Sequence, residues 1–307
     1  MRVGLSWDLD RFEDASTGWQ EIISEVVQAD RMGFHSFWIH EGREQVADCS
    51  APSIFLTYLS NKTQSGQLRI AGRCVTRALA AHVAEEVAVL DNFSRGRAGL
   101  AFAPASRQGV APGHVHEMID FVTSSWAVDE MRYRGEHIRF PAHTPDDAPP
   151  GASVPDVAGD YVPQWEWGPE TPDFLSITPK PYVPHTAVHV EIDDDETLEW
   201  AAKQGISPMV GADMPTAEAA LRLARYREIA DEAGRSRREI EGVLERRLVL
   251  DGDGDERTLG GSPRDILNAI RDLRRKTGIS HFVWRRGEPT PMDLYRFASE
   301  VQVLLQA

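Results

Sequence analysis

The feature of the sequence that most constrains its fold is a regular alternation of short apolar runs with longer amphipathic segments. Segments such as 19–33 and 216–234 carry apolar residues at helical spacing. The intervening apolar runs, each typical of a buried strand, lie at 2–7, 35–40, 68–76, 97–105, 186–192, 206–212, 241–250 and 281–286. A strand followed by a helix, repeated eight times, is typical of a closed parallel barrel. We therefore predict an α/β fold of the (β/α)8 TIM-barrel type.

An open, doubly wound sheet is the alternative architecture for such a pattern. Its dinucleotide-binding version needs a Gly-x-Gly-x-x-Gly turn after the first strand. No such turn follows residues 2–7, and this absence favours the barrel.

The alternation is interrupted once, after the fourth strand–helix unit. Residues 132–140 read as a small extended arm, and many prolines and glycines follow between 141 and 185. We predict one barrel domain over residues 1–307, with residues 141–175 as a long insertion that forms a lid. Trp165 and Trp167 alternate as neighbours on one face of this segment and are candidate lid residues over a substrate or a partner surface.

Charge and composition exclude several classes of function. The net charge of −15 disfavours binding to nucleic acid and to anionic membranes. We find no apolar run long enough for a membrane helix and no signal peptide at the N-terminus, and we expect a cytoplasmic protein. Cys49 and Cys74 lack metal-site spacing, and no third ligand accompanies the pair His114 and His116, so no metal site is predicted.

Several segments, taken in order, resemble the luciferase-like monooxygenase family of flavin- or deazaflavin-dependent barrels. "ADRMGFHSFWIHE" is similar to the family's second strand. "AEEVAVLDNFSRGRAGLAF" is similar to its third helix and fourth strand, where Asp91, Ser94, Gly96 and Arg97 match. "YRGEHIRF" is similar to its extended arm, and "LGGSPRDILNAIRDLRRKTGISHFVW" to its C-terminal unit. The resemblance covers most of the chain outside the insertion.

The resemblance implies an active site at the C-terminal mouth of the barrel, where the ring of reduced FMN, or of a deazaflavin, would lie. It also implies a small organic substrate and a dimer built on the helices at 52–63 and 82–94. The partner would be a second copy or a luciferase-like paralogue, and a flavin reductase is a further candidate partner.

The chain departs from the family at the end of its second strand. Glu41 is followed by Gly42 and Arg43, where the family places an imidazole. His40 lies one residue earlier, and in a strand that shift reverses the direction of the side chain.

Two further departures concern the grip on the cofactor phosphate. The fourth strand ends in Ala103 and Pro104, where an arginine is typical, although Arg107 follows three residues later. The helix after the fifth strand begins with residues 193–196, all acidic, which would cap the helix and repel a phosphate. We expect weak FMN binding by this chain alone, or none.

The candidate residues follow from these motifs. The catalytic candidates are His40, Glu41 and Arg43, and we expect Arg73 to pair with Glu41. The cofactor-binding candidates are Trp7, Arg73, Cys74, Arg107, Asp194 and Arg286.

Three functions remain open at this point. The first is a flavin-dependent monooxygenase or oxidoreductase acting on a small organic molecule. The second is a non-catalytic subunit that pairs with an active paralogue, and the third is a deazaflavin-dependent dehydrogenase. The missing phosphate grip weighs against the third.

Overall fold

The computed structural model describes residues 1–9, 15–41, 51–76, 79–140, 176–236, 240–287 and 291–306. In this part of the chain, eight parallel strands pair side by side in the order β9-β11-β1-β2-β3-β4-β7-β8, and β8 pairs with β9 to close the ring. The strands are β1 (Arg2–Trp7), β2 (Ser36–His40), β3 (Gln67–Arg73), β4 (Ala98–Phe102), β7 (Ala187–Glu191), β8 (Ser207–Val210), β9 (Val243–Leu250) and β11 (His281–Arg285). The predicted TIM barrel is confirmed.

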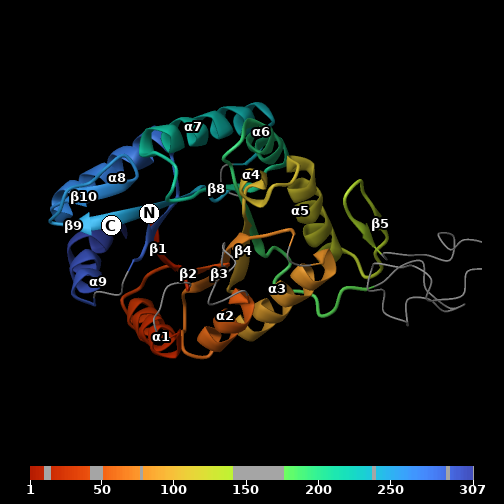
Figure 1. Cartoon of the computed structure of the whole chain (residues 1–307), viewed down its shortest axis with the longest axis horizontal. Helices are drawn as coiled ribbons and strands as arrows, with labels where there is room; N and C mark the ends of the chain where they lie inside the picture. The colour runs from red at the N-terminus through yellow and green to blue at the C-terminus, as the bar shows by residue number, and fades with distance from the viewer. Residues whose placement is uncertain are drawn as a thin grey trace, which may run out of the picture.

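Helices surround this barrel and bury their apolar faces against its strands (Figure 1). They are α1 (Ala15–Arg31), α2 (Pro52–Ser60), α3 (Ala80–Ser94), α5 (Pro112–Ala127), α6 (Asp195–Gln204), α7 (Thr216–Glu232) and α8 (Pro263–Thr277). The last helix runs from α9 (Pro291–Phe297) through a π-helical turn (Ala298–Gln302) into α10 (Val303–Gln306). No helix in the described ranges is both long enough and apolar enough to cross a membrane.

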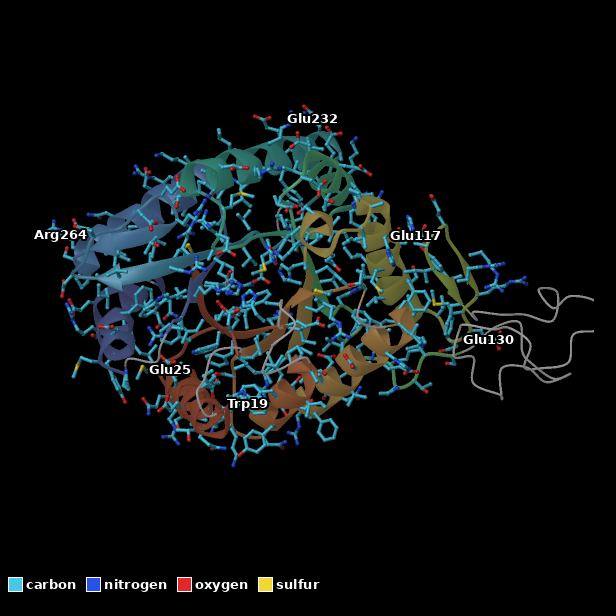
Figure 2. The ribbon with its side chains drawn as sticks, viewed as in Figure 1. Trp19, Glu25, Glu117, Glu130, Glu232 and Arg264 are labelled. Carbon is cyan, nitrogen blue, oxygen red and sulfur yellow. The ribbon has the colours of Figure 1, made fainter. Side chains whose placement is uncertain are left out.

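The extended arm is also confirmed. β5 (Tyr133–Arg134) pairs antiparallel with β6 (Arg139–Phe140). Glu117 on α5, labelled in Figure 2, accepts hydrogen bonds from the backbone N–H groups of residues 136, 137 and 138 and so fixes the turn of the arm. The predicted insertion at 141–175 lies outside the described residues.

Three local features differ from the sequence prediction. The helical pattern of the sequence starts at Met118, whereas α5 begins six residues earlier, at Pro112, because proline is favoured in the first helical turn. A short helix, α4 (Ala105–Gln108), follows β4. A ninth strand of the same sheet, β10 (Thr258–Gly261), pairs parallel with the second half of β9. We missed it because two of its four residues are glycines.

The barrel interior has three levels along its axis. On β2, the inward positions run Ser36, Trp38, His40, which is polar, apolar and polar. The same order is found at β9 (Glu241 just before the strand, then Val243 and Glu245) and on β11 (His281, Val283, Arg285). Trp38, Val243 and Val283 belong to one buried apolar cluster with Ala71, Ala101 and Met209. An apolar layer therefore separates a polar layer at each end of the barrel.

Asp91 and Arg97, which match the family pattern, connect the end of α3 and the start of β4 to neighbouring elements. Asp91 is fully buried and accepts hydrogen bonds from the backbone N–H groups of Ala98 (3.1 Å) and Val183 (3.1 Å). Arg97 donates to the carbonyl oxygens of Ser60, Gly66 and Ser94 and to the Thr63 hydroxyl, each at 2.9 Å. These residues tie α2, α3 and β4 together, so their role in this structure is to position elements.

Replacement of Asp91 by alanine should destabilise the protein by about 2–4 kcal/mol, because two backbone N–H groups lose their acceptor. Chemical denaturation of Asp91→Ala against wild type measures the change. His82→Ala on the exposed face of α3 is the matched control and should remain within about 0.5 kcal/mol of wild type. Equal stability of Asp91→Ala and the control would contradict this role.

Candidate active site at the C-terminal mouth of the barrel

Five polar side chains, on or just after the four strands β1, β2, β9 and β11, meet at the C-terminal end of the barrel interior, and we name them the mouth cluster: Ser6, Asp8, His40, Glu245 and Arg285. One Glu245 oxygen lies 2.7 Å from His40 Nε2 and 2.6 Å from the Ser6 hydroxyl. The other accepts hydrogen bonds from Arg285 Nη1 (3.2 Å) and the Ala212 backbone N–H (3.1 Å). The guanidinium of Arg285 also binds Asp8, with Nη2 2.6 Å from Oδ1.

The electrostatics of the cluster keep Glu245 ionised. Burial alone would raise its pKa, but the charges of His40 and Arg285, with hydrogen bonds from His40 and Ser6, hold the pKa well below its usual value. An ionised carboxylate accepts hydrogen bonds and donates none, so His40 Nε2 carries a proton and donates it to Glu245. The other ring nitrogen of His40 is Nδ1.

Space beside that nitrogen is left by a glycine at the end of β3. A Cβ atom on Gly72 would stand 3.6 Å from His40 Nδ1 and 4.0 Å from an oxygen of Glu191. The φ angle of Gly72 is +65°, a conformation that suits glycine. The backbone of β3 therefore passes within contact distance of both the His40 ring and the Glu191 carboxylate.

The predicted pair of Arg73 and Glu41 forms a second group on the neighbouring strand ends. Arg73 Nε lies 3.7 Å from a Glu41 oxygen, and Arg73 Nη2 lies 3.0 Å from Glu86. The same Glu41 oxygen accepts a hydrogen bond from the backbone N–H of Cys74 (3.1 Å). Glu41, Arg73 and Cys74 are thus brought together, and the buried thiol of Cys74 donates to the Gly72 carbonyl oxygen (3.6 Å).

Two cofactor-binding candidates are directed away from the interior. The Trp7 indole N–H donates to Glu25 (2.9 Å), and Arg286 Nε donates to the other oxygen of Glu25 (2.8 Å). Glu25 belongs to α1, as Figure 2 shows. The guanidinium of Arg286 also covers the Trp284 ring at 4.1 Å, so Trp7 and Arg286 pack between the barrel wall and α1.

The side where the family would hold a phosphate is acidic. Arg107 on α4 binds Glu191 through two hydrogen bonds, of 3.1 and 2.8 Å. Asp194 caps α6 by accepting from the Thr197 backbone N–H (2.7 Å). A cavity of about 270 Å³ lies here and is lined by Arg107 and four carboxylates, those of Glu191, Asp193, Asp213 and Glu218.

The pKa of Asp193 reflects this concentration of negative charge. Burial raises it, and the neighbouring carboxylates of Asp194 and Glu191 raise it further, against the opposing effect of a hydrogen bond from Ser106. A site that already disfavours ionisation of its own carboxyl group is poorly suited to a phosphate.

Sequence reasoning missed Glu245, Asp8 and Glu191. Asp8 follows β1 and Glu191 ends β7, whereas Glu245 lies in the first half of β9. A charged residue within the apolar run 241–250 was the available signal for Glu245. The predicted candidates Arg43, Trp165 and Trp167 lie outside the described residues.

Comparison with known proteins connects this geometry to a family. A sequence model of the luciferase-like monooxygenase family matches residues 1–259, whereas no curated protein sequence matches the chain. Among solved structures, a monooxygenase from Streptomyces bottropensis is 18% identical, with a TM-score of 0.78 over 99% of this chain and 100% of that chain.

Two further structures carry bound cofactors. An F420-dependent secondary alcohol dehydrogenase in complex with an F420–acetone adduct is 13% identical, with a TM-score of 0.74 over 99% of this chain and 98% of its own. The oxygenating constituent of 3,6-diketocamphane monooxygenase from Pseudomonas putida, in complex with FMN, is 15% identical, with a TM-score of 0.69 over 97% and 95%. At these identities the likeness shows a shared fold.

Replacement of Glu245 by glutamine should destabilise the protein by about 3–5 kcal/mol at pH 7, because His40 and Arg285 lose a buried counter-charge. The pKa of Glu245 is lower in the folded protein than in the unfolded chain, where it is about 4.3. The stabilising contribution is therefore complete above that value and is lost as the pH falls through the folded pKa.

Urea unfolding of Glu245→Gln and wild type across this pH range measures the difference. Asp213→Asn, which removes a half-exposed carboxylate paired with Arg247, is the control and should change stability by about 0.5 kcal/mol or less. A difference that did not shrink in acid would contradict the assignment of charge to Glu245.

Proposed function

Because the chain belongs to the luciferase-like monooxygenase family, we propose that it is a flavin-dependent oxidoreductase acting on a small organic substrate at the C-terminal mouth. The observation that carries the proposal is the buried contact between His40 and Glu245 at the floor of that mouth. A histidine oriented by an ionised carboxylate is a common arrangement for proton transfer. Supporting this choice, solved structures of the same fold contain FMN or a deazaflavin.

In this proposal the residues of the mouth cluster have distinct roles. Glu245 orients the His40 ring through its contact with Nε2, which places the imidazole for proton transfer. Arg285 supplies positive charge beside the reacting group and would stabilise negative charge that develops there. Asp8 holds Arg285 in position from the side of β1.

The described residues do not fit a tightly held flavin phosphate. The arginines near the mouth are engaged by carboxylates: Arg73 by Glu41 and Glu86, Arg107 by Glu191, Arg285 by Asp8 and Glu245, and Arg286 by Glu25. Pro104 precedes α4 without a side-chain cap and offers no N–H. We therefore propose that reduced FMN is a transient co-substrate delivered by a flavin reductase.

The second candidate is a non-catalytic subunit that pairs with an active paralogue. The pairing of the mouth arginines with carboxylates favours this candidate, because a subunit that binds no flavin needs no arginine to hold the flavin phosphate. A deazaflavin-dependent dehydrogenase is the third candidate, and the same pairing disfavours it.

Titration of the purified protein with oxidised and reduced FMN tests the proposal. We expect saturable binding with a dissociation constant weaker than about 1 μM, because charge-assisted phosphate contacts worth about 1.5–3 kcal/mol each are missing. Pro104→Arg combined with Asp194→Ser should strengthen binding about tenfold to a hundredfold, since serine can still cap α6 and the arginine adds a donor fork. Asp272→Ser on α8, remote from the mouth, should leave the affinity unchanged.

Other outcomes separate the candidates. Protein that copurifies yellow would show that other residues hold the phosphate and would end the non-catalytic alternative. Failure of both redox forms to bind, even to the double variant, would support the non-catalytic subunit.

We further propose a dimer through α2 and α3, formed with a second copy or with a paralogue. Ile54 and Tyr58 lie on one face of α2, with exposed fractions of 72% and 47%, and Leu79 and Phe93 beside or on α3 are 68% and 61% exposed. α2 packs directly against α3. Large apolar side chains gathered in this way are typical of protein–protein contacts.

Ile54→Asp combined with Phe93→Asp should convert a dimer to a monomer at micromolar concentration, because charged groups would be buried in the contact. Light scattering measures the mass. Leu221→Asp on α7, where the leucine is 72% exposed, is the matched control and should remain dimeric. The proposal would be refuted if the wild-type protein were monomeric both alone and when mixed with a luciferase-like paralogue.

A further inference from the structure

A large cavity opens at the N-terminal mouth of the barrel, opposite the candidate active site. Its volume is about 950 Å³, and its wall includes Arg2, Arg69, Glu241, Arg274 and Ser280. The apolar layer of Trp38, Val243 and Val283 separates it from the mouth cluster. The proposed oxidoreductase activity therefore makes no use of it.

Arg69 is the unusual member of this wall. It stands on β3 and is 5% exposed. Its Nη1 donates to the Ala98 carbonyl (2.8 Å) and its Nη2 to the Gln67 side chain (3.2 Å), whereas its buried Nε–H has no partner. Within the described part of the chain, no carboxylate forms an ion pair with this guanidinium.

A buried charge without a counter-ion is costly. The pKa of Arg69 is lowered mainly by its burial, and the charges of Glu241 and Asp91 oppose this effect only from a distance. A bound anion beside Arg69 would supply the missing counter-charge and offset the free-energy cost of burying this guanidinium.

Gly99 on β4 makes room for this guanidinium. A Cβ atom there would stand 1.8 Å from Arg69 Nη1 and 2.7 Å from the Ala187 carbonyl oxygen. The register places Arg69, Gly99 and Ala187 side by side on β3, β4 and β7. The guanidinium of Arg69 thus lies over Gly99, where the lack of a side chain leaves room for it at the cavity wall.

The described wall of the cavity has a surplus of positive charge, although the chain as a whole carries −15. It presents the guanidinium groups of Arg2, Arg69 and Arg274 against the carboxylate of Glu241. Glu241 is already engaged by Arg2 (2.6 Å), His281 (3.2 Å) and His189 (3.3 Å). The remaining positive charge is therefore available to a ligand.

Two hydroxyl groups on the same wall also lack partners. Thr186 Oγ1 and Ser280 Oγ are buried atoms that form no hydrogen bond with any of the described residues. Together with Arg69 Nε, they give the cavity three polar atoms whose hydrogen-bonding capacity is unused. Buried polar groups in native proteins are normally satisfied by protein, water or a ligand.

We propose that the N-terminal cavity is a binding site for a small oxyanion, a phosphate or carboxylate group, held by the guanidinium of Arg69. The exposed side chain of Arg274 adds attraction at the entrance, and the hydroxyls of Thr186 and Ser280 offer hydrogen bonds to other parts of the ligand. The inference is independent of the chemistry at the C-terminal mouth.

Calorimetric titration with inorganic phosphate, and separately with acetate, at constant ionic strength tests the site and distinguishes the two kinds of oxyanion. Wild-type protein should bind one of them saturably. Arg69→Met should weaken that binding about tenfold or more, the effect of losing one charge-assisted hydrogen bond. The variant should fold, because replacing a buried charge by an apolar side chain of similar size is often neutral or stabilising.

Arg274→Gln provides a second measurement that does not disturb the interior and should also weaken binding. Its matched control is Arg275→Gln, one residue further along α8, which removes a guanidinium that is 78% exposed and paired with Asp272. That variant should bind as wild type does. If Arg69→Met does not fold, the comparison of anion binding by Arg274→Gln and by Arg275→Gln decides whether the site exists.

Three results would overturn the proposal. The first is the absence of saturable binding of either anion to wild type. The second is binding that neither Arg69→Met nor Arg274→Gln weakens. The third is a crystal structure, grown in phosphate or acetate, with ordered water alone against Arg69.

Discussion

A carboxylate buried in the lumen of a closed barrel must be surrounded by donors, and Glu245 imposes this requirement on the whole C-terminal mouth. Its two oxygens engage Ser6, His40, Arg285 and the Ala212 backbone, which belong to β1, β2, β11 and the turn after β8. Glu245 thereby connects strands that are distant in the sequence, at the end of the barrel where we expect the active site. The orientation of the His40 ring therefore follows from the need to surround the Glu245 carboxylate with donors.

The apolar layer around Trp38 divides the interior into two electrostatic environments. The indole N–H of Trp38 donates to the Ser36 hydroxyl (2.7 Å), and this hydroxyl also contacts His281 (2.8 Å). These contacts connect the apolar layer to the polar groups at the N-terminal end of the barrel. Side chains in the layer exclude water between the two ends, and a charge at one end is compensated by groups at that end. Glu245 relies on Arg285, whereas Glu241 relies on Arg2 and two histidines.

The barrel could be predicted from the sequence because each strand and helix has its own local hydrophobic period. The pairing of side chains could not, since it depends on which strand ends become neighbours after closure. Arg107 and Arg286 illustrate the limit: both were cofactor-binding candidates in the sequence, but folding brings Glu191 and Glu25 against them. The predicted contact of Arg73 with Glu41 succeeded because β2 and β3 are adjacent both in sequence and in space.

In a strongly acidic chain, the informative cations are those that folding leaves without a carboxylate. At the C-terminal mouth the arginines are matched by acidic partners, and the adjoining cavity has more carboxylates than guanidiniums. At the N-terminal mouth the balance is reversed, and Arg69 is buried there among carbonyl and amide oxygens. The two ends therefore differ in the ligand that we propose for each: a neutral or weakly held molecule beside His40 at the first, and an anion at the second.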